Sequence, residues 1–323
     1  MRPLSCLWYL ALYLVVVAGK SNAATTHEKI SYHGWPEAFL LKNDQAELVV
    51  VPAIGRVMQF KLAGDADGPF WENRALDGKP TQPQSSEWIN FGGDKTWPSP
   101  QGEWEKMTGR GWPPPTAFDS LPLSVQREGE ELVLRSAIDP SYGIETERRI
   151  SLSADKPEMT IQTTYRKVRG NPVRVGIWII TQLREPERIF MPLPQSTLFP
   201  TGYNKQSSTL PAQLRVTNSM VSCVRSAAEN CKIGSDASHL IWADDRVVLD
   251  IHAEREGTGE FPDNGSSAEI YTNADPNKYV ELELLGPLHL MKPGDSTSRQ
   301  QTYRLFRRDG NLDQQVSKIL KDR

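Results

Sequence analysis

The chain has 323 residues, and its hydrophobic (38%) and charged (24%) contents are typical of globular proteins, which excludes a disordered or collagen-like chain. Its 37 lysines and arginines against 40 aspartates and glutamates give a net charge of −3, too balanced for a nucleic-acid-binding protein with a broad basic face. The 24 prolines and 23 glycines predict many short elements joined by turns instead of a helical bundle.

The first residues have the pattern of a secretory signal peptide. Arg2 precedes an apolar stretch over residues 4–18, and small residues at 21 and 23 suit a cleavage site after Ala23. The apolar stretch is shorter than the ~20 residues that span a bilayer. We therefore expect residues 1–23 to be removed, and residues 24–323 to form a single periplasmic or secreted domain with no membrane anchor.

Runs of apolar and β-branched residues, separated by turn residues, predict strands along the mature chain. Residues 159–165 alternate between apolar and polar side chains, whereas 175–180 form a continuous apolar run typical of a buried strand. The expected strands cover residues 47–52, 55–62, 131–137, 144–152, 159–166, 173–181, 239–242, 246–252, 268–273, 279–285 and 300–306.

One helix is expected near the C-terminus. Asn311 can cap it, and Leu312, Val316, Ile319 and Leu320 share one face. Regularly spaced strands with little helix are typical of a sandwich or barrel. The sequence therefore predicts an all-β protein, a large antiparallel β-sandwich with a short C-terminal helix.

The segment 69–115 interrupts the strand pattern and is rich in Trp, Gly and Pro. Long connections of this kind are usually functional or disordered, and a high aromatic content argues against disorder. We expect its 90–101 part to be a loop in which a Gly-Gly turn and tryptophan faces accompany polar groups, an arrangement that suits a sugar ring. A structural loop with an Asp94–Lys95 salt bridge is the alternative. The candidate binding residues in this loop are Asn90, Asp94, Lys95, Trp97 and Gln101.

Two predicted strands carry further candidates. Trp178 and Gln182 share one side of a strand and could line a pocket, although a core tryptophan is the commoner explanation. Glu281 and Glu283 lie on one side of the strand at 279–285, opposite its apolar residues. These glutamates are either exposed surface groups or, if they face a cleft, candidate catalytic bases.

Cys223 and Cys231 are close in the sequence. In an exported protein this spacing predicts a disulfide, with two buried free thiols as the alternative. The five histidines form no metal-binding signature, so we expect no metal and no cofactor.

Several segments together resemble the galactose-mutarotase-like β-supersandwich superfamily. They are the strand pair ending at Gly55-Arg56, the stretch 142–150, and the C-terminal segment from Glu281 to Pro287. The motifs NFGGDKTWPSPQ at 90–101 and WIITQ at 178–182 are similar to those of a bacterial branch of that superfamily.

The resemblance implies a sugar site on a concave sheet face. Mutarotases use a glutamate near the C-terminus as base, which corresponds to Glu281 or Glu283, and Arg56 becomes a plausible countercharge. Their central histidine acid has no counterpart in the strand 178–182. The implied function is an exported carbohydrate-active protein, mutarotase- or epimerase-like, whose partner is a carbohydrate or sugar-derived small molecule, not nucleic acid or membrane. A non-catalytic carbohydrate-binding protein and an envelope interaction protein without a sugar site stay open as alternatives.

Overall fold

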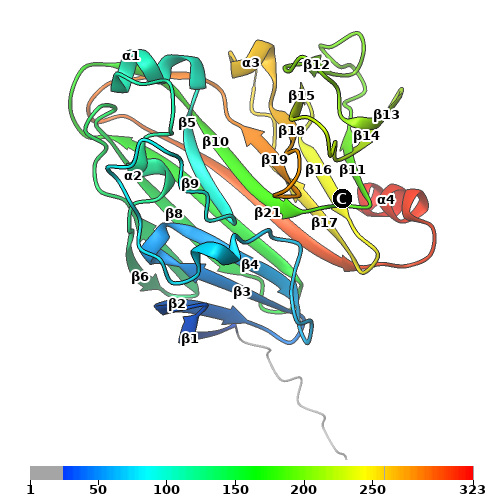
Figure 1. Ribbon diagram of the computed structural model, residues 1–323, viewed down its shortest axis with the longest axis horizontal. Helices are drawn as coiled ribbons and strands as arrows, with labels where there is room; N and C mark the ends of the chain where they lie inside the picture. The colour runs from blue at the N-terminus through cyan, green and yellow to red at the C-terminus, as the bar shows by residue number, and fades with distance from the viewer. Residues whose placement is uncertain (1–24, 258, 323) are drawn as a thin grey trace, which may run out of the picture.

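Two large antiparallel sheets make up most of the protein (Figure 1). The computed structural model describes residues 25–257 and 259–322, so the predicted signal peptide lies outside the described residues. Within them, one sheet has eleven strands and the other has ten. The predicted all-β sandwich with a short C-terminal helix is confirmed.

The elements have the following bounds. In spatial order, the first sheet contains β1 (Thr26–Tyr32), β2 (Trp35–Lys42), β3 (Ala46–Val51), β4 (Arg56–Leu62), β5 (Asp94–Ser99), β10 (Val173–Arg184), β19 (Tyr279–Leu285), β18 (Ala268–Thr272), β15 (Cys231–Ser235) and β12 (Asn204–Lys205), with β20 (His289–Met291) beside β10. The second contains β13 (Ala212–Thr217), β14 (Met220–Val224), β11 (Arg188–Pro192), β16 (His239–Ala243), β17 (Val247–His252), β21 (Ser296–Arg307), β9 (Glu158–Lys167), β8 (Ile144–Leu152), β7 (Glu131–Arg135) and β6 (Ser124–Glu128). The α-helices are α1 (Trp104–Thr108), α2 (Thr116–Asp119), α3 (Pro262–Gly265) and α4 (Leu312–Lys321).

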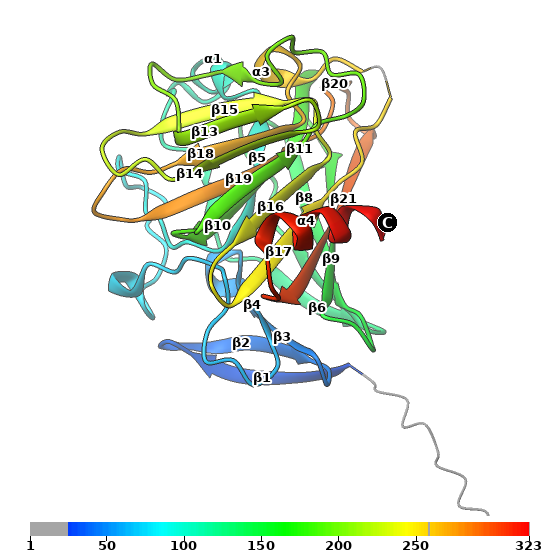
Figure 2. The same cartoon turned by 90° about the vertical axis from the view of Figure 1, so that its right-hand side faces the viewer.

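The main core lies between the two sheets. Leu282 and Leu284 of β19 belong to one buried cluster with Leu249 and Leu305 of the second sheet. Helix α4 packs on the outer side of the second sheet, beside β16 and β17 (Figure 2). The side chain of Asn311 accepts a hydrogen bond from the Gln314 amide, which is the predicted cap. Among the described residues, no helix is long and apolar enough to cross a membrane.

The segment 69–115 differs from the expectation of a loop, because β5 forms inside it. This strand is buried throughout and pairs with β10, with Asp94 opposite Thr181 at one end and Ser99 opposite Gly176 at the other. Its sequence, DKTWPS, lacks the apolar alternation on which strand prediction depends, since its inward-facing positions begin with a charged residue. The predicted strands at β8 and β19 have the observed bounds.

The two cysteines are free thiols, so the predicted disulfide is not formed. Cys223 lies on β14 of the second sheet and Cys231 on β15 of the first. Both are buried, and Cys223 belongs to the apolar core cluster. The sequence spacing does not reflect the fold here, because Cys223 packs as a small apolar side chain in the core whereas the Cys231 sulfur lies 3.2 Å from the Thr209 hydroxyl.

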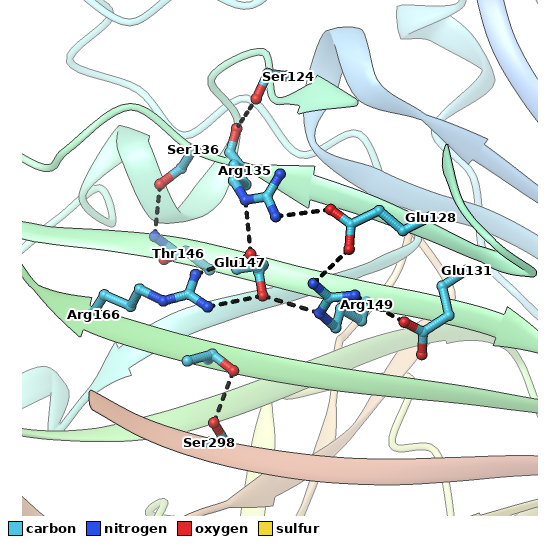
Figure 3. A network of polar contacts seen from close by, with 11 residues as sticks. Ser124, Glu128, Glu131, Arg135, Ser136, Thr146, Glu147, Arg149, Arg166 and Ser298 are labelled. Atoms are coloured by element: carbon cyan, nitrogen blue, oxygen red, sulfur yellow. Dashed lines mark hydrogen bonds and ion pairs between the residues drawn. The ribbon is translucent and has the colours of Figure 1, made fainter. Parts of the chain in front are cut away.

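A network of arginines and glutamates covers the outer face of strands β6 to β9 (Figure 3). Glu147 is at its centre, 2.9 Å from Arg166, 2.7 Å from Arg135 and 3.2 Å from Arg149. Hydrogen bonds from Arg166 and Arg135 lower the pKa of Glu147 to about 2, against the effect of burial.

We expect Glu147→Gln to lower the melting temperature near pH 7 by roughly 2–4 °C. The folded-state pKa lies below the ordinary value of 4.5. The carboxylate therefore contributes its full stability above that value, and loses it as the pH falls toward 2. Thermal melts from pH 7 to pH 2 should show the two proteins converging in acid. Glu145→Gln on the same strand is the matched control, and an E147Q difference that persists at pH 2 would contradict the assignment.

Candidate functional site

The outer face of the eleven-stranded sheet carries two adjoining rows of functional side chains. Because side chains alternate along a strand, Lys95 and Trp97 of β5 point away from the second sheet while Asp94 points toward it. The register places Trp97 opposite Trp178, and Glu281 between Gln182 and Tyr271. Central strands that are far apart in the chain therefore bring an aromatic row beside an acidic row.

A cavity of about 650 Å³ lies over this face, within the roughly 300–1,000 Å³ range of small-molecule sites. The segments 73–90 and 101–112 supply part of its wall. Its lining residues are Asn73, Leu76, Trp88, Ile89, Asn90, Trp97, Gln101, Trp112, Trp178, Lys232, Tyr271, Asn273, Asn277, Tyr279, Glu281 and Glu283.

One wall of the cavity is a cluster of tryptophans centred on Trp97. Its ring lies 5.3 to 5.9 Å from those of Trp88, Trp104, Trp112 and Trp178, always edge to face. This geometry is the preferred one for aromatic pairs and holds each ring in place.

Arg56 and Asp119 anchor that wall from behind. The Asp119 carboxylate accepts hydrogen bonds from Arg56 at 2.9 Å, from Trp97 Nε1 at 2.8 Å and from Trp88 Nε1 at 3.3 Å. Both charged groups are buried. The predicted role of Arg56 as a countercharge to the C-terminal glutamates is therefore wrong, because its charge is paired with Asp119.

Glu281 presents a carboxylate to the cavity. Its Oε1 is hydrogen-bonded, whereas its Oε2 is available to a ligand. Gln182 Nε2 donates to Oε1 at 2.8 Å, and Lys95 Nζ lies 3.6 Å from the same oxygen. Within the described residues, no group hydrogen-bonds Oε2, and the residue is 7% exposed. Burial lowers the pKa of Lys95 to about 8, although Glu281 opposes that shift.

Glu283 belongs to a second, more enclosed cluster with Lys232 and Glu269. The Lys232 ammonium lies 2.8 Å from Glu283 and 2.7 Å from Glu269, and Trp178 Nε1 donates to Glu283 at 2.7 Å. Burial raises the pKa of Glu269 to about 7 and also raises that of Glu283. Two carboxylates thus share one ammonium, and such a cluster readily holds an extra proton near neutral pH.

The Gly-Gly pair that precedes β5 is required by its surroundings. Gly92 has φ +91°, and a Cβ there would lie 2.2 Å from the Trp71 carbonyl oxygen. Gly93 has φ +70°, and a Cβ there would lie 2.5 Å from the Val57 carbonyl oxygen. Only glycine satisfies both conditions, so the pair lets the chain enter the centre of the sheet.

Residues 37–306 match the family described as Domain of unknown function (DUF4380). The chain belongs to this family. No curated protein matches the sequence of this DUF4380 protein.

Solved structures share the fold at low identity. A galactose mutarotase-like protein from Clostridium acetobutylicum has a TM-score of 0.53 and 9% identity, over 89% of this chain and 100% of its own. A galactose mutarotase related enzyme from Lactobacillus acidophilus has a TM-score of 0.53 and 10% identity, over 83% of this chain and 97% of its own. A TPR-domain containing protein from Parabacteroides distasonis has a TM-score of 0.57 and 12% identity. The match covers 85% of this chain but only 48% of that protein. The DUF4380 protein therefore has the galactose mutarotase-like fold.

Most of the predicted site residues gather at the cavity, with Asp94 a clear exception. The structure places Asn90, Trp97, Gln101, Trp178, Glu281 and Glu283 in the lining, while Lys95 of β5 and Gln182 of β10 contact Glu281. Asp94 instead faces the space between the sheets. There it pairs with Arg148 and accepts hydrogen bonds from Thr181 at 2.8 Å and Tyr303 at 2.6 Å. Its predicted binding role is wrong, because strand alternation turns it away from Lys95 and Trp97.

Sequence reasoning did not identify Lys232, Glu269, Tyr271 or Trp112 as site residues. Lys232 and Glu269 are single charged residues in short strands and belong to no motif. The available signal was the alternation of the predicted strand at 268–273, which puts Glu269 and Tyr271 on one side.

We expect Asp94→Asn to lower the free energy of unfolding by about 3–5 kcal/mol, because it leaves the buried Arg148 without its countercharge. The substitution should leave ligand affinity of the folded protein unchanged, since Asp94 does not reach the cavity. Urea denaturation and calorimetric titration of the same samples test both parts. Asp44→Asn, at an exposed turn, is the control, and weakened binding with unchanged stability would contradict this placement.

Proposed function

We propose that this protein binds a sugar in the tryptophan-walled cavity and exchanges its anomers, in the manner of a mutarotase. The observation that carries the proposal is the open Oε2 of Glu281, held beside a proton-holding cluster on the same cavity wall as Trp97 and Trp178. The mutarotase names of structural relatives support the same reaction. The signal-peptide pattern supports action in the periplasm or outside the cell.

The chemistry uses one base and one acid. Glu281 Oε2 takes the proton of the anomeric hydroxyl while Glu283, in its cluster with Lys232 and Glu269, gives a proton to the ring oxygen. The bond between the anomeric carbon and the ring oxygen breaks, leaving an open-chain aldehyde. Rotation of the aldehyde and reversal of both proton transfers close the ring as the other anomer, and each group regains its starting state.

The cluster with Lys232 and Glu269 replaces the acid that the missing histidine would supply. Among the described residues that line the cavity there is no histidine, and the carboxylate Asp94 faces the other way. Burial raises the pKa of the Glu283 carboxyl, which favours the protonated form that a donor needs.

The proposal is tested by exchange NMR on equilibrated aldohexoses and 6-deoxyhexoses with and without the mature protein. We expect protein-dependent anomer exchange for at least one sugar. Binding without exchange, measured by ligand-observed NMR, would leave a carbohydrate-binding protein and refute the enzyme. No binding of any sugar would refute sugar recognition itself.

The pH dependence gives a separate prediction. We expect the exchange rate to fall as the pH rises through about 7, the pKa to which burial raises Glu269, because the donor Glu283 shares the Lys232 ammonium with Glu269 and the two carboxyls titrate together. We expect Glu269→Gln, which cannot ionise, to move this fall to a different pH. Exchange rates from pH 5 to pH 9 measure the effect, and a wild-type rate that increases steadily above pH 7 would contradict the donor assignment.

A further inference from the structure

We propose that Trp112 and Gln101 form a second sugar subsite, so that the cavity takes the reducing end of a disaccharide or longer saccharide. This inference rests on the proposed function, because it extends the same cavity. It is carried by two side chains that the acid–base chemistry does not use.

Trp112 is an exposed aromatic face in a fixed orientation. It is 45% exposed although it lines the cavity, whereas Trp97 and Trp178 are each only 3% exposed. Its ring stacks on Trp104 at 6.2 Å and 20°, and its edges meet Trp88 at 5.3 Å and Trp97 at 5.9 Å. These contacts restrict its motion, so a sugar face can stack on it with little loss of conformational freedom.

Gln101 supplies polar groups on the same cavity. Its exposed side chain lines the cavity, and within the described residues no group hydrogen-bonds its side-chain amide. It therefore offers two donor hydrogens and an acceptor oxygen to ligand hydroxyls. By contrast, Asn90 already accepts a hydrogen bond from the Gly92 amide.

The position of Trp112 separates it from the reacting groups. Trp112 contacts Trp97, Trp97 contacts Trp178 at 5.3 Å, and Trp178 in turn donates to Glu283. A sugar ring held at Glu281 and Glu283 would lie beyond Trp97, leaving the Trp112 face for a second ring. A cavity of about 650 Å³ suits ligands of drug size, which are larger than one hexose.

Calorimetric titration of D-glucose against lactose, maltose and cellobiose, all three of which carry glucose at the reducing end, tests the proposal. We expect at least one disaccharide to bind about tenfold more tightly than its reducing-end monosaccharide. Trp112→Ala should weaken disaccharide binding more than monosaccharide binding and so remove that difference, while Trp112→Phe should keep most of it. Circular dichroism confirms that each variant is folded.

The outcomes separate the two proposals. Disaccharides that bind no more tightly than monosaccharides would overturn the second subsite, while anomer exchange that requires Glu281 would leave the proposed function standing. An equal loss of mono- and disaccharide affinity in folded W112A would also overturn the subsite, because it would place Trp112 in a single-ring site. If no sugar binds the wild type, both proposals fail.

Discussion

Glu281→Gln is expected to reduce anomer exchange by roughly 10²- to 10⁴-fold while leaving the fold intact. The glutamine keeps the size of the side chain and an oxygen that can accept the hydrogen bond from Gln182, but it cannot take the proton of the anomeric hydroxyl. Exchange NMR at saturating sugar measures the rate, and calorimetric titration measures the affinity. A large loss of rate with modest change in affinity identifies Glu281 as the base.

Glu37→Gln is the matched control, because Glu37 is an exposed glutamate on β2, remote in sequence from the cavity segments. It should retain the wild-type rate. Full exchange by E281Q would show that the base lies elsewhere among the cavity residues. A comparable loss in Glu283→Gln is expected as well, since that variant removes the proton donor.

Lys232→Met should lower the free energy of unfolding by about 3–5 kcal/mol near neutral pH. It leaves Glu269 and Glu283 buried without the ammonium that lies within 2.8 Å of both. Burial already raises the pKa of both carboxyls, and loss of Lys232 removes the charge that opposes this rise. Since the unfolded chain ionises freely above the ordinary carboxyl pKa, the loss of stability should grow from pH 5 to pH 8.

Urea denaturation of this variant at those two pH values measures the effect. Lys205→Met, at an exposed lysine on neighbouring β12, should change stability little at either pH. Equal behaviour of the two variants would show that the carboxylates do not depend on Lys232. A difference in unfolding free energy between K232M and the wild type that is present at pH 8 and disappears at pH 5 would support the electrostatic cause.

The fold could be predicted largely from local patterns. Strands β8 and β19 have the predicted bounds because their apolar residues alternate or run continuously. Strand β5 could not be predicted, because the residues that stabilise it are distant. Asp94 is buried against Arg148, which lies 54 residues away, and that pairing is invisible in DKTWPS itself.

The site was predictable where one strand supplied it. Glu281 and Glu283 share a strand face, and so do Trp178 and Gln182, so alternation alone grouped them correctly. Arg56 was misassigned because its partner Asp119 comes from a short helix in an irregular segment. Lys232 brings together carboxylates from two strands, and only the register of β15, β18 and β19 reveals that.

The tryptophan wall also gives the cavity an intrinsic spectroscopic signal. Five indoles lie with ring centroids 5.3 to 6.3 Å from a neighbour, close enough for their electronic transitions to couple. Two ammonium groups sit over this array, with Lys95 5.1 Å from Trp97 and Lys232 4.6 Å from Trp178, and their fields tune its excited states. Excitation energy can transfer between rings this close, so we expect a molecule that stacks on one ring to alter the emission of its neighbours as well. Native fluorescence and near-ultraviolet dichroism thus report occupancy without any attached dye.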